Sequence, residues 1–253
     1  MTRDLSLLTS KEIVDAFNSC NGVIIPVASL EQCGLHAATG VDIKVADYIS
    51  PILADKFDML VSPTIAYGDT LEMADYPGTV NIPTDVLSNF YYSVASSFLA
   101  SGAKCVLFFV SHSLNMRAVD NTCRKLYSEG KKAIAVDFWK ACSQVSKGIL
   151  SDSEYGTGHG AEQITSVSLA INPMLIKKEK AVNEEPLPSF GTRVKHIYGS
   201  SNVCTAYSNF HDYSTTGSWG DVSKASEEKG KRIIEEAISL IVREVFEVRT
   251  LHN

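Results

Sequence analysis

Unbroken apolar runs alternate along the chain with segments whose apolar residues recur at helical spacing. The runs 23–28 and 105–110 show no apolar–polar alternation, which is typical of strands buried on both faces of a sheet. Two shorter runs, at 59–62 and 133–137, have the same character. Apolar strands separated by amphipathic helices predict an α/β protein with a mostly parallel sheet that helices cover on both faces.

Helices are predicted where the helical spacing is flanked by start and stop signals. Thr9 and Glu12 fit a capping box, and Gly102 and Gly130 are placed to end helices. Pro51 is expected to kink or break the helix in which it lies. The predicted helices cover residues 10–18, 43–57, 86–101, 115–129 and 224–248.

Polar side chains with metal-binding chemistry follow two of the predicted strands. Glu31 lies in the loop after the strand 23–28, Asp42 closes that loop, and His112 follows the strand 105–110. Ligands of parallel sheets bind beyond the carboxyl ends of the strands, so we expect these three side chains to lie close together. Two carboxylates and an imidazole can hold a divalent metal with coordination positions left open, which metal-assisted hydrolysis requires.

Length and composition fit a single globular domain spanning residues 1–253, with 45% hydrophobic and 21% charged residues. The net charge of −6 argues against a nucleic-acid partner, because such binding needs clustered Lys and Arg. No apolar run approaches the roughly 20 residues that cross a bilayer. The cysteines form no C-x-x-C pair, which predicts a reducing, cytoplasmic location. Residues 181–221 are expected to form a long loop region that shapes a pocket.

Several blocks of sequence stand out in a fixed order along nearly the whole chain. They are Ala28–His36 followed by Asp42, Ala66–Gly68, Tyr76–Thr79, Val110–Asn115, Gly158–Ser166 and Gly217–Gly230. In this order the blocks resemble the motifs of the creatininase (creatinine amidohydrolase) family. The resemblance implies a single three-layer α/β/α creatininase-like domain, hydrolysis of a non-peptide C–N bond, and a homo-oligomer, commonly a hexamer.

The resemblance also implies the ligands of a metal centre. Members of the family typically bind two divalent ions, and the ligands of one are present here as Glu31, Asp42 and His112. The other set is altered, because Cys33 replaces a ligating His and Leu114 stands where creatininase has a Glu. We therefore expect one divalent ion per chain, and two carboxylates with one imidazole would accept Zn, Fe or Mn. Cys33 remains a candidate metal ligand, since a thiolate binds zinc well; a nucleophilic role for it has no precedent in the family.

The family's catalytic histidine, which passes a proton to the leaving nitrogen, falls on His159, and Glu162 is a candidate to orient it. The candidate substrate-binding residues are Tyr155, Ser113, His36 and Asn115. Gly158 stands where creatininase uses a substrate-binding Glu, so creatinine itself is not the expected substrate.

The leading hypothesis is a metal-dependent amidohydrolase that acts on an amide, lactam or formamide of a small molecule. One alternative keeps a single metal but catalyses a cyclisation or lyase step, because the altered second metal set removes part of the family's hydrolytic equipment. Another is a non-catalytic homologue that only binds a ligand. The complete set of Glu31, Asp42 and His112, together with His159, favours an enzyme, since a mere scaffold has no need of them.

Overall fold

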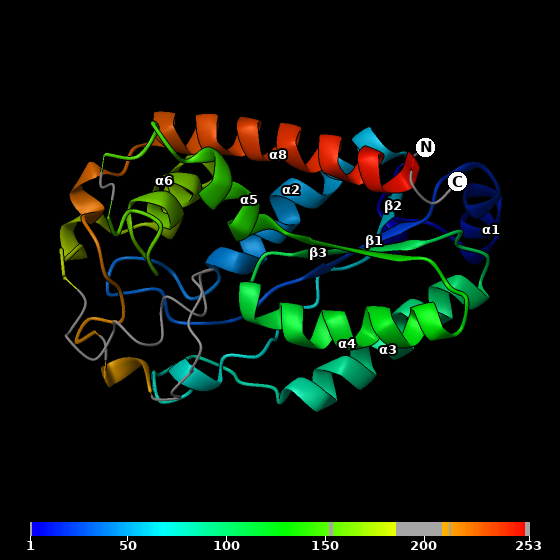
Figure 1. Ribbon diagram of the computed structural model, residues 1–253, viewed down its shortest axis with the longest axis horizontal. Helices are drawn as coiled ribbons and strands as arrows, with labels where there is room; N and C mark the ends of the chain where they lie inside the picture. Colours follow the sequence, from blue (N-terminus) through cyan, green and yellow to red (C-terminus); the bar gives the residue numbers. More distant parts are fainter. Residues whose placement is uncertain (1, 152–153, 186–208, 213, 251–253) are drawn as a thin grey trace.

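A four-stranded parallel sheet forms the centre of the protein (Figure 1). The computed structural model describes residues 2–151, 154–185, 209–212 and 214–250. The strand order is β2-β1-β3-β4. The strands are β1 Val23–Val27, β2 Leu60–Val61, β3 Val106–Val110 and β4 Ala133–Asp137. The predicted parallel sheet is therefore confirmed, with each strand within a residue or two of its expected range.

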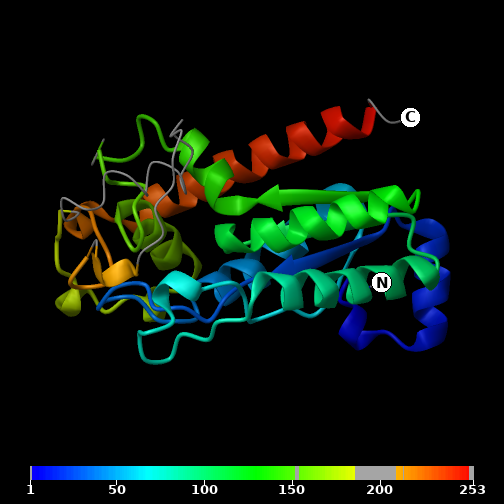
Figure 2. The ribbon, with the colours of Figure 1, turned by 60° about the horizontal axis from the view of Figure 1, so that its bottom comes forward.

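Helices cover both faces of this sheet, so the three-layer α/β/α prediction is confirmed (Figures 1 and 2). On one face lie α2, α5, α6 and α8, and on the other lie α1, α3 and α4. The helices are α1 Ser10–Ser19, α2 Val41–Phe57, α3 Thr84–Ala100, α4 Met116–Ser128, α5 Phe138–Val145, α6 Glu162–Ile171 and α8 Glu227–Thr250.

The period-two alternation of strand side chains divides the core into two clusters. Ile24 and Phe109 pack with α2, α5 and α8, whereas Val23, Ile25 and Phe108 pack with α1, α3 and α4. Every residue of β1 and β3 is buried. This burial on both faces is the physical reason for their unbroken apolar sequence.

The chain reverses its direction of travel across the sheet next to β1. From β1 it passes to β2 on one side and then crosses to β3 on the other, so β1 and β3 flank a topological switch point. In open parallel sheets, the carboxyl ends of the strands at such a point border a crevice in which ligands bind. Val27 and Val110 are register partners at this end, so the loops that follow β1 and β3 start side by side.

Several predicted elements differ from the structure. Helix α2 begins at Val41, so Asp42 lies in its first turn and not in the preceding loop. The helix also runs unbroken through Pro51, because its buried face packs in the core and offsets the lost backbone hydrogen bond. Helices α5 and α6 were not predicted. Most of the loop region expected over 181–221 lies outside the described residues.

The longest described helix, α8, packs along α5 and α6 on one face of the molecule (Figure 1). Its buried residues Ile233, Ala237, Ile241 and Val245 recur every four positions, as predicted for a helix that packs on the core. Across the described residues, no helix is both long enough and apolar enough to cross a membrane.

Gly22 permits the close approach between the starts of β1 and β3. Its φ is +144°, and a Cβ at this position would collide with the carbonyl oxygen of Cys105. Gly22→Ala should therefore cost about 3 kcal/mol or more in free energy of unfolding, from backbone strain and the clash together. Urea unfolding measures this loss.

Gly130→Ala is the matched control. Gly130 also has a positive φ, of +71°, but no atom lies near its would-be Cβ. Only the backbone strain remains, so the expected loss is about 1 kcal/mol. Equal losses in the two variants would contradict the close-approach explanation.

Candidate metal centre and active site

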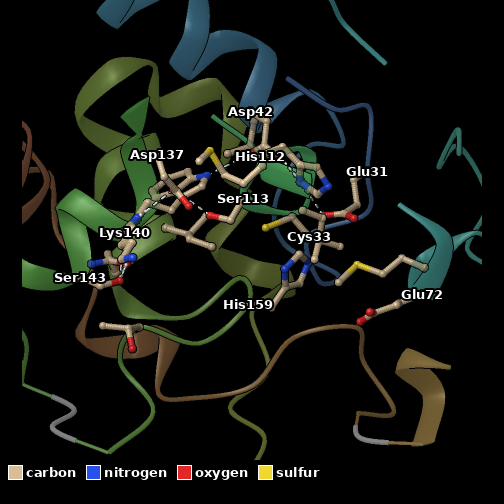
Figure 3. A pocket seen from close by; sticks show the side chains of 18 of the residues that line it. Glu31, Cys33, Asp42, Glu72, His112, Ser113, Asp137, Lys140, Ser143 and His159 are labelled. Atoms are coloured by element: carbon tan, nitrogen blue, oxygen red, sulfur yellow. Dashed lines mark hydrogen bonds and ion pairs between the residues drawn. The ribbon is translucent and has the colours of Figure 1, made fainter. Parts of the chain in front are cut away.

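Glu31, Asp42 and His112 converge at the switch point, as the sequence predicts (Figure 3). Glu31 lies in the loop after β1, His112 follows β3, and Asp42 lies in the first turn of α2. One potential ligand atom from each residue lies within 4.8 Å of the other two. The three residues form the one such group among the described residues.

Backbone and side-chain contacts fix the orientation of these ligands. Nε2 of His112 donates to the carbonyl oxygen of Asp69 at 2.8 Å, so that nitrogen carries the proton. Nδ1 of His112 is then left to face Asp42 at 3.1 Å and Glu31 at 3.6 Å. Such a hydrogen bond on the far nitrogen is the usual means of orienting a metal-binding histidine.

Asp42 is held by hydrogen bonds to both of its carboxylate oxygens. The Ser29 hydroxyl donates to Oδ2 at 2.8 Å, and the Trp139 indole donates to Oδ1 at 3.1 Å. The same indole N–H donates to the carbonyl oxygen of Ser111 at 2.6 Å. The position of Asp42 in the first turn of α2 is favourable, because an anion there interacts well with the helix dipole.

The electrostatics of the group suit a cation. Burial raises the pKa of Glu31, and the negative charge of Asp42 adds to this effect, while His112 partly offsets it. Burial opposes a charge on His112, but the carboxylates of Glu31 and Asp42 outweigh it and raise the pKa of the imidazole. Oε1 of Glu31 is buried and has no hydrogen-bond partner. A divalent ion would satisfy that oxygen and neutralise both carboxylates, so these residues fit a metal centre.

Cys33 lines the same cavity but does not belong to the group of mutually close ligand atoms. Burial raises its pKa well above the ordinary value of a thiol, and the carboxylates of Asp42 and Glu31 add to the shift. A protonated thiol is a poor ligand and a poor nucleophile. Leu114 also lines the cavity, and its side chain offers no ligand atom.

His159 enters the cavity from the loop before α6. Its Nε2 donates to the carbonyl oxygen of Gln32 at 2.9 Å, so the unprotonated nitrogen of the neutral ring is Nδ1. Burial lowers the pKa of His159 to about 4, and the bond to Gln32 offsets this only in part. The ring also packs edge-to-face on Phe210 and lies near Trp219. His159 is therefore a neutral base at ordinary pH.

The cavity that contains these groups has a volume of about 500 Å³. Met73, Phe210 and Trp219 form an apolar cluster that contributes part of its wall. Ser113, Asp137 and other polar side chains contribute another part, where the Ser113 hydroxyl donates to Asp137 at 2.9 Å. The volume suits a small organic molecule or a short segment of a larger one.

Of the four candidate substrate-binding residues, the structure brings Ser113 to the cavity wall and gives the other three different surroundings. His36 is buried and its Nε2 bonds to the hydroxyl of Thr165 at 3.0 Å. The side chain of Asn115 joins the Asp69 amide to the carbonyl of Ala28. Tyr155 packs against the apolar cluster of Met73, Phe210 and Trp219 from outside the cavity wall.

Glu162 does not hydrogen-bond to His159, whose ring bonds to Gln32 instead. The Glu162 carboxylate is fully buried at the start of α6, where it accepts from the Ser151 amide and pairs with Lys229 of α8. These contacts tie the segment before His159 to two helices. The sequence predicted a direct contact between Glu162 and His159. In the structure, Glu162 instead helps to position the loop that carries His159.

Sequence reasoning did not identify the groups that orient the ligands and the base. Those groups are the carbonyl oxygens of Asp69 and Gln32 and the side chains of Ser29 and Trp139. A carbonyl oxygen has no side-chain signature, so no pattern could have revealed the first two. Trp139 did carry a signal, because an aromatic residue directly after a buried strand is well placed to cover a pocket.

Comparisons with known proteins identify the family of this chain. A family model described as creatininase, creatinine amidohydrolase, matches residues 6–245. The mycofactocin precursor peptide peptidase of Mycolicibacterium smegmatis is 28% identical over 225 residues, covering 86% of this chain and 81% of that protein. The 3-dehydro-scyllo-inosose hydrolase of Thermotoga maritima is 27% identical over 184 residues, covering 71% of this chain and 59% of that protein.

Solved creatininase structures share the fold of this chain. A structure described as creatininase Mn superimposes with a TM-score of 0.80 at 20% identity, and covers 98% of both chains. A creatininase mutant described as Zn-Zn type gives a TM-score of 0.79 at 21% identity, with the same coverage.

The geometry predicts that Asp42 is required for metal binding. Asp42→Asn keeps the shape of the side chain but removes a charged ligand, so divalent-ion affinity should fall by more than about 100-fold. Loss of a residue that only hydrogen-bonds to a ligand typically costs less than this. Elemental analysis and competition with a chelator measure this, and the wild-type protein should hold about one ion per chain.

Asp137→Asn serves as the control for Asp42→Asn. Asp137 also lines the cavity but lies outside the ligand group, and Asn can still cap α5. This variant should keep its ion. Loss of metal in Asp137→Asn to the same extent would show that general cavity charge, and not the three ligands, holds the ion.

His159 should titrate far below an ordinary histidine. An imidazole with a pKa near 6.5 is mostly protonated at about pH 5.5, whereas His159 with a pKa of about 4 should stay neutral there. Nuclear magnetic resonance of the metal-free protein can follow its ring signals, assigned by their loss in His159→Gln. The same spectra should show the proton on Nε2. A midpoint near 6.5 would contradict the burial argument.

Proposed function

Because the chain belongs to the creatininase family of hydrolases, we propose that it is a metal-dependent amidohydrolase that cleaves the C–N bond of an amide, lactam or formamide. One observation carries the proposal. Glu31, Asp42 and His112, with a buried carboxylate oxygen that lacks a partner, share a cavity with the neutral base His159. Amide hydrolysis needs both a cation to polarise the carbonyl and a group that moves a proton.

Glu31, Asp42 and His112 would hold one divalent ion per chain. When bound, such an ion supplies Lewis acidity, which lowers the pKa of water and polarises a carbonyl oxygen. The single-ion proposal is supported by Cys33, which lies outside the group of mutually close ligand atoms, and by Leu114, which has no ligand atom. The donor set would accept Zn, Fe or Mn.

His159 would move the proton. Since its pKa is lowered, the ring enters the reaction neutral, with Nε2 donating to Gln32 and Nδ1 carrying a lone pair. It first accepts a proton from the attacking water at Nδ1 and then returns that proton to the leaving nitrogen. The residue thus acts as a base before it acts as the donor that the family resemblance implies, because a resting imidazolium is disfavoured by burial.

The apolar part of the cavity wall favours the same reaction by excluding water. Phe210 and Trp219 stack on each other with their ring centroids 5.0 Å apart, and Met73 packs beside them. These side chains exclude water from one side of the cavity. Exclusion of water strengthens the electrostatic interactions inside the cavity.

Creatinine is disfavoured as the substrate by the packing around Gly158. A Cβ at this position would collide with the indole of Trp219, so the space that a larger side chain needs is already filled. The substrate-binding Glu implied by the family resemblance therefore has no place here. Among the relatives, one is named for a peptide and another for an inosose, so similar proteins are named for substrates other than creatinine.

The proposal is tested by turnover. Wild-type protein loaded with Zn²⁺ or Mn²⁺ is offered a panel of amides, lactams, formamides and short peptides, and release of amine or ammonia is measured. On the best substrate, His159→Ala should lower turnover by a factor on the order of 10²–10⁴, with metal content unchanged. His211→Ala, in a residue that stacks on Tyr76 and does not line the cavity, is the control.

Two outcomes would contradict the proposal. Loss of metal from His159→Ala would make that residue a ligand and not a base. A fully metal-loaded wild-type protein that cleaves no member of the panel would favour the lyase or ligand-binding alternatives.

A further inference from the structure

Two cationic side chains, Arg117 and Lys140, belong to the wall of the catalytic cavity. Arg117 lies in the first turn of α4, just after β3, and Lys140 lies in the first turn of α5, just after β4. Because β3 and β4 are neighbouring parallel strands, both helices begin at the same edge of the sheet. In Figure 3, Lys140 and Ser143 lie on the opposite side of the cavity from Glu31 and Glu72.

The placement of these cations is unfavourable for the helices that carry them. A positive charge in the first turn of a helix opposes the helix dipole, which favours anions there. The other described α-helices each have an acidic residue in the first turn, and they are α1, α2, α3, α6 and α8. Only α4 and α5 among the described α-helices have none. Helix stability therefore does not account for Arg117 and Lys140.

Ion pairing within the protein does not account for them either. Among the described residues, no carboxylate lies within salt-bridge distance of Arg117 or Lys140, and both residues are exposed, so their charges are available to a ligand. Burial raises the pKa of Asp137 by more than the charge of Lys140 lowers it. The carboxylate of Asp137 already accepts from Ser113 and from the backbone amide of Lys140.

The charges of the cavity wall are separated in space, with Glu31 and Glu72 on one side and Lys140 on the other. A divalent ion would neutralise Glu31 and Asp42. Of the two other carboxylates in the wall, Glu72 lies across the cavity from Lys140, and Asp137 already accepts from Ser113 and from the Lys140 amide. The chain as a whole carries a net charge of −6 and would repel anions, so an anionic substrate needs a local positive region in order to bind. Guanidinium and ammonium groups are the usual protein partners of carboxylate and phosphate.

We propose that the substrate carries an oxyanion, a carboxylate or a phosphate, that Arg117 and Lys140 bind while the amide carbonyl lies at the metal centre. The inference rests on the proposed hydrolase function and names its substrate class. An N-acyl amino acid, or a short peptide with a free terminal carboxylate, has this arrangement of groups, and so does an amide that bears a phosphate. A neutral lactam does not.

Metal-anchored probes test this without a known substrate. A hydroxamic acid binds a divalent ion directly, and a carboxylate at the far end of its chain can then reach the cations. The monohydroxamic acids of succinic, glutaric and adipic acid supply three lengths, and straight-chain alkyl hydroxamic acids of equal length are the neutral counterparts. Phosphonoalkyl hydroxamic acids distinguish phosphate from carboxylate. Calorimetric titration of the Zn²⁺-loaded protein measures each dissociation constant.

At one of the three lengths, we expect an anionic probe to bind about tenfold more tightly than its neutral counterpart, since a hydrogen bond to a charged partner gives an effect of that size. Arg117→Gln combined with Lys140→Gln should abolish this preference. Higher salt concentration should weaken it in the wild type. The control Lys147→Gln removes a positive charge outside the cavity wall and should keep the preference.

The outcomes separate the two proposals. Equal affinity for anionic and neutral probes at all lengths, or a preference that survives in the double variant, overturns the oxyanion site. An equal loss in Lys147→Gln also overturns it, because net charge would then be the cause. Failure of even the neutral hydroxamic acids to bind in a metal-dependent way contradicts the metal centre, and with it both proposals.

Discussion

Two carboxylates with little exposure to water, at the end of an apolar sheet, are the constraint on which this structure depends. Glu31 is buried and Asp42 is mostly buried in the cavity wall, and Oε1 of Glu31 has no hydrogen-bond partner. Removing a carboxylate from water is costly unless a cation or hydrogen-bond donors compensate it. Ser29, Trp139 and His112 supply part of that compensation. The negative charge that these three residues leave uncompensated would be neutralised by a divalent ion.

The two halves of the chain contribute differently to the site. The metal group comes from residues before position 113 and rests on the paired strands β1 and β3, whose register is fixed along their full length. The base comes from the loop before α6, and this loop is joined to the first half through the carbonyl of Gln32 and to the C-terminal half through the Trp219 amide. The sheet thus positions the candidate metal ligands, whereas the candidate base lies on a loop.

The sequence predicted the parts of the site that depend on residue type at a strand end. Glu31 and His112 each follow an unbroken apolar run, which gave a modest signal. The order of the blocks that resemble the creatininase motifs then identified them together with Asp42. Helix α5 was missed because its few residues directly follow β4, too short a stretch to show a period. Helix α6 was missed because it buries polar residues such as Gln163 and Thr165, which hide the apolar spacing. The pairing of Glu162 with Lys229 joins positions far apart in sequence, which no local pattern records.

The tryptophans have a consequence for how the molecule can be observed. The chain has two, Trp139 and Trp219, and both line the cavity of the candidate metal centre. One donates its indole N–H to Asp42, and the other stacks on Phe210 beside His159. Indole emission depends on hydrogen bonding and on nearby charge, and here no distant tryptophan dilutes the signal. The intrinsic ultraviolet fluorescence of the unlabelled protein is therefore an optical reporter of what occupies its cavity.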